Sequence, residues 1–215
     1  MTFFILTRHP TRAICEDNAN YQSNSYIYRI KFFLMINAEF IIKKLKLEKH
    51  IREGGYFTES YRSNDVISND KFHNKKKDEN KISKEKTYPK KIRPVSTLIY
   101  YLLVGTQYSA IHRVKSDEIW HFYLGSPVTI HIINDEHISP RVQLGNNLEN
   151  DDNIHYVVTK DTWFCAEIND KTSFALMGCT VSPGFDYEDF ELGSKDKLLL
   201  QYPQHKDLIE RFTNQ

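Results

Sequence analysis

Apolar and polar positions alternate along this chain in short runs, and turn residues separate one run from the next. Eight runs fit strands: Tyr56–Arg62, Leu98–Val104, Ile119–Leu124, Val128–Ile133, Arg141–Leu144, Ile154–Val158, Trp163–Glu167 and Ser173–Val181. Short strands at this spacing predict an all-β protein, an antiparallel sandwich or barrel. A short helix is predicted from Ala38 to about Lys46, with Asn37 as its N-cap. Pro203 opens a second helix near the end of the chain.

Two regions depart from this pattern. Met1–Leu34 has no clear period, so we expect residues 1–34 to be a poorly structured N-terminal extension of a domain that covers residues 35–215. Residues 64–91 change to lysine, asparagine and acidic residues with little apolar content. Such a segment cannot bury enough apolar surface to offset its ordering entropy. It is predicted to be a lysine-rich insertion loop.

The insertion contains a run of three lysines, Lys75–Lys77, which admits two interpretations. It is either an arm that binds nucleic acid or a solvated loop. Asp78, Glu79 and Glu85 dilute its charge, and neither arginine nor an aromatic residue is interleaved within the run of lysines itself. The solvated loop is therefore favoured. The formal net charge of +1 over 215 residues also argues against a dedicated nucleic-acid binder.

Composition and cysteine usage predict a soluble, cytoplasmic protein. With 40% hydrophobic residues, the chain can build a sizeable core. Its three cysteines, Cys15, Cys165 and Cys179, form no CxxC motif and suggest reduced thiols. The apolar run Ile30–Ile36 is interrupted by Lys31 and is too short to span a bilayer, so no membrane association is expected.

Most of the candidate chemistry lies between Thr97 and Gly125, which we interpret as two strands joined by a short polar turn. Strand alternation places Glu118, Trp120 and Phe122 on one face, and Ile119, His121 and Tyr123 on the other. If the first face is interior, Glu118 lies among aromatic rings near His112. The alternative is a half-buried hairpin in which His112 and Glu118 pair with each other or meet solvent.

Several blocks of the chain, in order, resemble one small-cupin family that is catalogued as a domain of unknown function. The resemblance runs from about Ala38 to Phe212. It is carried by blocks that include Glu53-Gly-Gly-Tyr-Phe, Ser96-Thr-Leu-Ile-Tyr-Tyr-Leu-Leu, His112-Arg, Ser116-Asp-Glu-Ile-Trp-His-Phe-Tyr-Leu-Gly and Gly178-Cys-Thr-Val-Ser-Pro-Gly-Phe-Asp-Tyr-Glu-Asp-Phe-Glu-Leu. The resemblance implies an all-β, double-stranded β-helix (jelly-roll) cupin barrel with short helices at both ends. It also implies a homodimer.

The general cupin metal pattern is damaged in this chain. Glu118 and Gly125 keep the E-x6-G spacing, and His112 stands where the first histidine of the pattern belongs. Val114 and Phe164 replace two of the four expected ligands. A tight transition-metal site needs at least three protein ligands. His112 and Glu118 therefore fall short unless another side chain joins them, and we predict no metal and no cofactor.

Two functions follow from these observations. The first is a binding module whose polar and aromatic pocket holds a small molecule such as a carbohydrate or a nucleotide-sugar. Its predicted ligand-binding residues are His112, Glu118, Trp120, Phe122, Tyr101, Trp163, Phe57 and Tyr61. The alternative is a metal-independent epimerase or isomerase, similar to the sugar epimerases built on the same barrel. In that case His112 is the base, and Tyr101 or Tyr61 is the acid.

Overall fold

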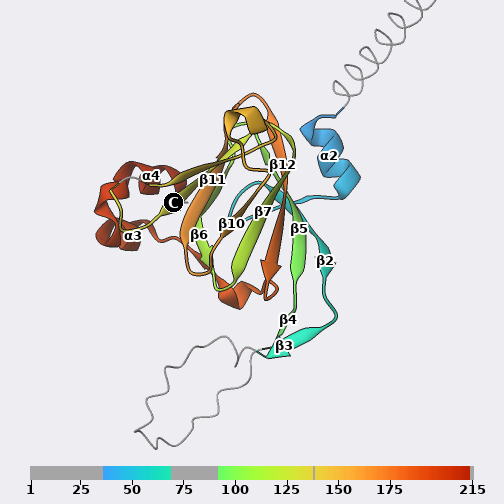
Figure 1. Cartoon of the computed structure of the whole chain (residues 1–215), viewed down its shortest axis with the longest axis horizontal. Coiled ribbons are helices and arrows are strands. Elements are labelled where there is room, and N and C mark those ends of the chain that lie inside the picture. Colours follow the sequence, from blue (N-terminus) through green and yellow to red (C-terminus); the bar gives the residue numbers. More distant parts are fainter. Residues whose placement is uncertain (1–35, 69–91, 138, 214–215) are drawn as a thin grey trace, which may run out of the picture. The chain divides into compact units, whose positions relative to one another are not determined.

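A computed structural model of the protein describes residues 36–68, 92–137 and 139–213. The predicted N-terminal extension and most of the lysine-rich insertion, Lys75–Lys77 included, lie outside these ranges. In the described part of the chain, thirteen strands form antiparallel sheets, joined by a few short helices (Figure 1). This confirms the all-β class with short helices. The sheets are not closed into a barrel.

The larger sheet has six strands and provides most of the walls of the site described below. Its strand order is β1 (Glu48–Lys49), β2 (Tyr56–Arg62), β5 (Thr97–Val104), β12 (Phe174–Ser182), β7 (Asp117–Gly125) and β10 (His155–Val158). The predicted strand Tyr56–Arg62 matches β2 in both bounds. The predicted alternation of β7 is also confirmed, because Glu118, Trp120 and Phe122 are buried while Tyr123 is exposed.

The second sheet has five strands, in the order β13 (Phe190–Leu192), β6 (Tyr108–Val114), β11 (Trp163–Ile168), β8 (Val128–Ile133) and β9 (Arg141–Leu144). The main hydrophobic core lies between the two sheets. Tyr101, Trp120 and Met177 contribute to it from the larger sheet, and Ile130 and Phe164 from the smaller one. A separate two-stranded sheet pairs β3 (Val66–Ser68) with β4 (Ile92–Pro94).

The interpretation of Thr97–Gly125 as two strands joined by a turn is wrong. The stretch forms three strands, and its middle part is β6, which belongs to the smaller sheet. Strand β12 lies between β5 and β7 and pairs with both. Ser109 and His112 follow the predicted turn, and both are buried within a separate strand that the prediction lacked. Because β6 belongs to the smaller sheet, the His112 side chain lies between the two sheets.

The helices are short and lie near the ends of the described chain. Helix α2 (Ala38–Leu45) agrees with the prediction, and the Phe40 backbone N–H donates to Asn37 Oδ1 at 2.8 Å, which confirms the N-cap. Near the C-terminus, α3 (Lys195–Gln201) precedes the predicted helix, which consists of η4 (Pro203–His205) and α4 (Lys206–Phe212). Two further 3-10 turns are η2 (Leu148–Asn150) and η3 (Tyr187–Asp189).

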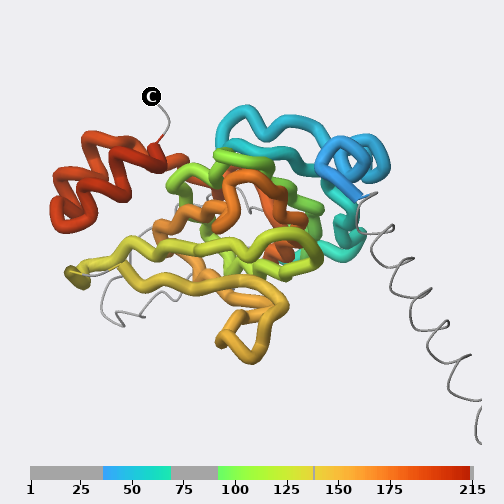
Figure 2. The backbone as a smooth tube through the Cα atoms, turned by 90° about the horizontal axis from the view of Figure 1, so that it is seen from above, coloured from blue at the N-terminus to red at the C-terminus, as the bar shows by residue number. Residues whose placement is uncertain are grey.

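The two C-terminal helices pack against one end of the outer face of the five-stranded sheet (Figures 1 and 2). Leu198, Ile209 and Phe212 of these helices form a second core with Ile111 and Trp163 of the sheet. Strand β6 is therefore buried on both faces. This double burial explains why its sequence does not alternate as an exposed strand would.

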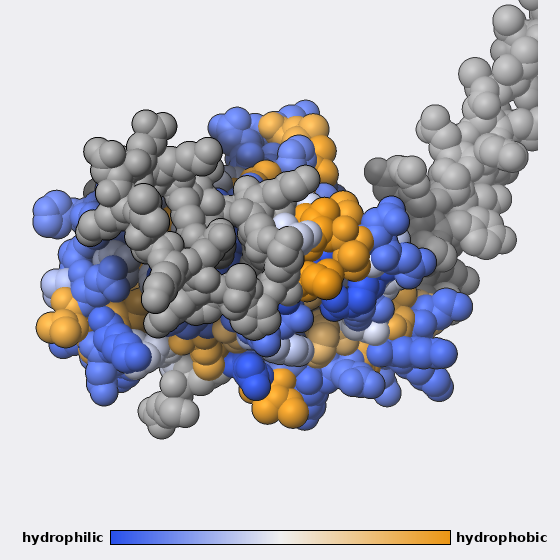
Figure 3. All heavy atoms as spheres, turned by 90° about the horizontal axis from the view of Figure 1, so that it is seen from below, coloured by the Kyte–Doolittle hydropathy of each residue, from blue (hydrophilic) through white to orange (hydrophobic). Residues whose placement is uncertain are grey.

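The surface carries scattered apolar side chains. On the face shown in Figure 3, hydrophobic residues form separate groups between hydrophilic ones. Ile51 and Leu200 are among the large hydrophobic residues that are exposed. None of the helices within the described ranges combines the length and hydropathy that a membrane crossing requires.

Gly125, at the end of β7, provides a test of the sheet packing. Its φ is +104°, and a Cβ added there would lie 2.2 Å from the Phe174 carbonyl oxygen of β12. We expect Gly125→Ala to lower the free energy of unfolding by more than about 2 kcal/mol, because backbone strain and a clash with main chain combine. Denaturant unfolding measures the loss.

Gly105→Ala is the matched control for this substitution. Gly105 also has a positive φ, of +61°, but the nearest atom to an added Cβ is 3.5 Å away. Only conformational strain applies there, and the expected loss is about 1 kcal/mol. Equal losses in the two variants would contradict the predicted clash at Gly125.

Candidate functional site

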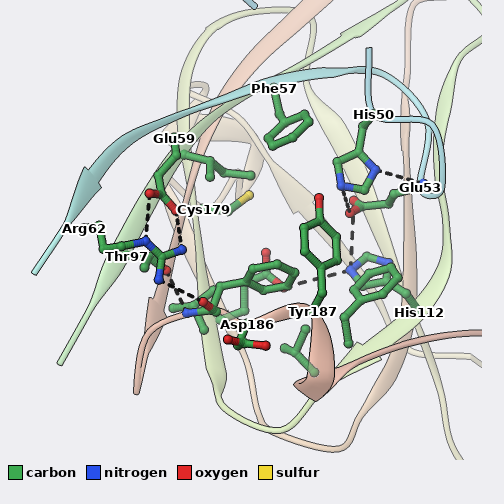
Figure 4. A pocket seen from close by; sticks show the side chains of 16 residues that line it. His50, Glu53, Phe57, Glu59, Arg62, Thr97, His112, Cys179, Asp186 and Tyr187 are labelled. Atoms are coloured by element: carbon green, nitrogen blue, oxygen red, sulfur yellow. Dashed lines mark hydrogen bonds and ion pairs between the residues drawn. The ribbon is translucent and has the colours of Figure 1, made fainter. Parts of the chain in front are cut away.

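A cavity of about 220 Å³ opens between the two sheets (Figure 4). This volume far exceeds the about 10–15 Å³ that one water molecule requires. The side chains that line it come from β2, β5, β6, β7, β12, β13 and two loops. They are His50, Glu53, Phe57, Glu59, Arg62, Thr97, Ile99, His112, Val114, Glu118, Cys179, Val181, Phe185, Asp186, Tyr187 and Phe190.

His112 lies on β6 with its ring 2% exposed. Its Nδ1 is 2.8 Å from the Ala110 carbonyl oxygen, which can only accept a hydrogen bond, so Nδ1 carries a proton. The ring packs against Phe164 and stacks on Phe190, with centroid distances of 4.3 and 5.3 Å. These contacts fix both the orientation and the tautomer of the ring, and they leave Nε2 to face the cavity.

Two carboxylates flank this Nε2 atom. Glu53 Oε1 lies 3.9 Å away and Glu118 Oε2 lies 4.0 Å away. Glu118 is 7% exposed. Burial is the main cause that raises the pKa of Glu118 to about 7, and the negative charge of Glu53 adds to the rise while His112 opposes it. Near neutral pH, Glu118 is therefore poised to carry a proton and to donate a hydrogen bond.

Glu53 belongs to the loop before β2 and is held by its neighbours. Ser109 Oγ donates to Glu53 Oε1 at 2.5 Å. The Glu53 backbone N–H donates to His50 Nδ1 at 2.9 Å, so a neutral His50 carries its proton on Nε2, which lies 3.8 Å from Glu53 Oε2. Burial lowers the pKa of His50 and favours this neutral form. The Glu53 carboxylate is thus fixed in place beside His112.

The other end of the cavity is more exposed. Glu59 and Arg62 form a bidentate pair there, with distances of 2.9 and 2.6 Å, and Arg62 Nη1 also donates to the Phe185 carbonyl oxygen at 3.3 Å. Figure 4 shows the Tyr187 side chain pointing across the cavity toward His50. The Arg52 guanidinium lies over the Tyr187 ring, 5.2 Å from its centroid. Arg62, the arginine that lines this end of the cavity, is thus already paired with the carboxylate of Glu59.

The predicted site residues divide into two groups. His112, Glu118 and Phe57 line the cavity together. Tyr101, Trp120 and Phe122 lie in the main core, and the Tyr101 hydroxyl donates to the Gly54 carbonyl oxygen at 2.9 Å. Trp163 belongs to the second core, under the Arg113 guanidinium, and Tyr61 is 53% exposed. The roles of these five residues in ligand binding stay predictions.

The sequence analysis did not select several residues that line the cavity. His50, Glu53, Asp186 and Tyr187 are the most important of them for its chemistry. Glu53, Asp186 and Tyr187 lie in blocks that carried the family resemblance, but those blocks served only to recognise the family. Their proximity to His112 depends on the three-dimensional fold, because Glu53 and Ser109 are 56 residues apart in the chain. No local spacing could reveal that contact.

The geometry also bears on metal binding. Val114, at the position of the second histidine in the cupin pattern, lines the cavity, while Phe164 packs against His112. Across the described residues, no group of three or more histidine, cysteine, aspartate or glutamate side chains is arranged to hold a metal ion. In the cavity, the Nε2 atom of His112 and the two carboxylates are able to form hydrogen bonds.

Two antiparallel sheets with a polar cavity between them define a two-sheet antiparallel β protein. The chain belongs to the cupin superfamily, in the family described as DUF985, whose model matches residues 39–193. This confirms the resemblance drawn from the sequence blocks. A search of curated proteins gave no match.

Two solved structures are similar over most of the chain. A protein from Shewanella oneidensis is 34% identical, with a TM-score of 0.67, and the match covers 84% of this chain and 99% of that one. A hypothetical protein from Leishmania major is 29% identical, with a TM-score of 0.69 and coverage of 84% and 100%. These similarities support the family assignment, and neither description states an activity.

Proposed function

We propose that the cavity binds a small, uncharged metabolite rich in hydroxyl groups, such as a carbohydrate. The observation that carries this proposal is the convergence of His112 Nε2, Glu53 and Glu118 on one buried point. Buried polar groups of this kind are expensive to desolvate unless a ligand or partner uses them. Carboxylates accept hydrogen bonds from hydroxyl groups, and a protonated Glu118 donates one in return.

The charge of the lining favours a neutral ligand over an anionic one. Among the described lining residues, the carboxyl groups of Glu53, Glu59 and Asp186, and that of Glu118 when it is ionised, stand against one arginine. That arginine, Arg62, is already paired with Glu59. Among the described residues that line the cavity, no cation is left unpaired to offset the repulsion that a phosphate group would meet. The lining thus supports a carbohydrate over a nucleotide-sugar, the two ligand types considered from the sequence.

The apolar part of the lining suits the same ligand. Phe57, Phe185, Tyr187 and Phe190 present aromatic rings to the cavity. Pockets for small molecules combine apolar and aromatic walls with a few fixed polar groups. The C–H faces of a sugar ring would pack on these aromatic walls while its hydroxyl groups reach Glu53, Glu118 and His112.

Three further expectations from the sequence are part of this proposal. We propose that the two sheets form the double-stranded β-helix of the cupins, that the protein is a homodimer, and that it binds its ligand without a metal. Light scattering would test the dimer, since a 25.4 kDa particle at micromolar concentration contradicts it. Elemental analysis would test the metal: stoichiometric zinc, iron or manganese that is lost in His112→Ala contradicts metal-independent binding.

A second candidate function is a metal-independent epimerase or isomerase, and the fixed tautomer of His112 favours it. With Nδ1–H bound to Ala110, the Nε2 lone pair of neutral His112 faces the cavity. There it would take a proton from a carbon next to a carbonyl group, and an acid on the opposite side would return one. Of the candidate acids, Tyr101 lies in the core and Tyr61 is exposed, whereas Tyr187 lines the cavity.

Isothermal titration with neutral monosaccharides tests the binding proposal, with the corresponding sugar phosphates as anionic competitors. We expect His112→Gln to weaken binding of a neutral sugar about tenfold or more, because a hydrogen bond to a buried polar group is lost. His121→Gln is the control, since His121 lies on the opposite face of β7 and contacts Thr180. Preference for the phosphates, or equal binding by the His112 variant, would contradict the proposal.

Solvent deuterium separates the two functions. An epimerase incorporates deuterium at the carbon next to the carbonyl group of a keto-sugar, whereas a binding module does not. Incorporation that disappears in His112→Gln would establish His112 as the base. Saturable binding of a sugar without deuterium exchange would support the binding function and exclude the epimerase.

A further inference from the structure

A second cavity, of about 460 Å³, lies on the other side of the five-stranded sheet, where α4 and η4 meet β8, β9 and β11. It shares no residue with the first cavity. Figures 1 and 2 show the C-terminal helices beside this sheet. Its lining residues are His131, His137, Ser139, Arg141, Glu167, Gln204, His205, Lys206, Asp207, Leu208 and Arg211.

The charge of this lining is opposite to that of the first cavity. Arg141, Lys206 and Arg211 provide three permanent positive charges, against the two carboxylates of Glu167 and Asp207. These cations come from β9 and α4, which lie far apart in the sequence. Three histidines add further hydrogen-bonding groups. Such a surplus of positive groups in a concave site favours an anion.

Glu167 offers little repulsion to an anion because its oxygens are already occupied. His131 Nε2 lies 3.1 Å from Glu167 Oε1, and Lys171 Nζ lies 2.6 Å from Oε2, which also contacts Arg211. These positive groups lower the pKa of Glu167 although burial acts against them. The Arg141 guanidinium, in contrast, makes no hydrogen bond or ion pair with another described residue.

His131 gives an independent sign that a ligand belongs here. The residue is 5% exposed, and its Nδ1 atom is buried without a hydrogen-bond partner among the described residues. An unsatisfied buried polar atom is unusual in a native protein and often marks an unobserved water or ion. Because Nε2 donates to Glu167, Nδ1 donates to an anion when the ring is protonated. Burial lowers the pKa of His131, and a nearby anion would oppose that effect by stabilising the protonated ring.

We propose that this second cavity binds a small oxyanion, the phosphate or carboxylate group of a metabolite, through Arg141 and Lys206 beside the Glu167 cluster. Arg141 provides two parallel N–H groups for the oxygens of the anion. Lys206 adds a positive charge. The negative charge of the bound anion raises the pKa of the buried His131. This proposal is independent of the neutral ligand proposed for the first cavity.

Isothermal titration with inorganic phosphate and with succinate, at low ionic strength, tests the proposal and distinguishes the two oxyanions. We expect saturable binding of one of them, weakened about tenfold or more in Arg141→Gln, because a charge-assisted hydrogen bond to the anion is removed. Raising the salt concentration should also weaken binding, since exposed charges are screened. Lys160→Gln is the control, because it removes the same charge outside the cavity.

Nuclear magnetic resonance of the histidine side chains supplies a second readout. Binding of the anion at this site should raise the pKa of His131 and leave that of His50, in the first cavity, unchanged. Arg141 is exposed, so its replacement should not unfold the protein. Absence of saturable binding by both anions, equal affinity in Arg141→Gln, or an unmoved His131 titration would each overturn the proposal.

Discussion

Glu118→Gln is expected to be more stable than the original protein at pH 8, by up to about 3 kcal/mol, and to lose this advantage near pH 4.5. The folded protein holds the pKa of Glu118 at about 7, against 4.5 for the free side chain, chiefly because the carboxyl group is buried. Between these two values the folded state binds more protons than the unfolded state. The stability of the original protein therefore falls as pH rises through this window.

Glutamine resembles the protonated carboxyl group and does not ionise. The stability of the variant therefore does not fall as pH rises through this window. Denaturant unfolding at pH 5, 6.5 and 8 measures the difference at each pH. Glu191→Gln is the control, because Glu191 is an exposed partner of Arg113 and its removal should change little with pH. A stability difference between Glu118→Gln and the original protein that is constant over the whole range would contradict a raised pKa for Glu118.

The local pattern of the sequence was sufficient for most of the strands. Tyr56–Arg62, Val128–Ile133 and Arg141–Leu144 were predicted with the bounds that the structure shows. Each run is bounded by turn residues or ends at a glycine, and each has β-branched or aromatic side chains suited to a sheet. Strand β6 was missed because it is buried on both faces and contains polar residues that serve the cavity. These polar residues interrupt the apolar run that would have indicated a strand.

The candidate site was predictable only where its residues share one strand or one recognised motif. Alternation along β7 correctly placed Glu118 on the buried face, and the cupin pattern selected His112. The same alternation grouped Trp120 with Glu118, but Trp120 lies deeper, in the core. Alternation along one strand predicts which face a side chain is on. It does not predict how far that side chain lies from the cavity, because this distance depends on how the two sheets pack together. The loop residues Glu53 and Asp186 reach the cavity for the same reason.

Loss of Arg93 is expected to have the largest effect on stability. Arg93, on β4, is 6% exposed, and its Nε donates to Asp189 Oδ2 at 2.6 Å. Its Nη2 donates to Asp189 Oδ1 at 3.2 Å and to Glu188 Oε2 at 3.0 Å. These bonds raise the pKa of Arg93 above its ordinary value. They tie β4 to the segment that carries Asp186 and Tyr187 into the first cavity.

Arg93→Ala should lower the free energy of unfolding by about 3–5 kcal/mol, because the buried carboxylate of Asp189 would be left without its partner. The affinity of the first cavity for the neutral sugar proposed above should fall as well, since the loop from Phe185 to Phe190 loses its anchor. Thermal and denaturant unfolding measure the first effect, and isothermal titration with the neutral monosaccharides of the binding test measures the second.

Two further variants distinguish the effect of breaking the buried Arg93–Asp189 ion pair from the effect of removing a positive charge in general. Arg113→Ala removes an arginine paired with the exposed Glu191, and its expected loss is only about 1 kcal/mol. Combining Arg93→Met with Asp189→Asn removes both buried charges and should recover part of the stability, because no buried carboxylate is left without a partner and Glu188 is exposed to solvent. If Arg93→Ala were no less stable than Arg113→Ala, the ion pair with Asp189 would not anchor the cavity loop, and another contact, such as the Gly184 N–H to the Pro94 carbonyl oxygen, would have to hold it.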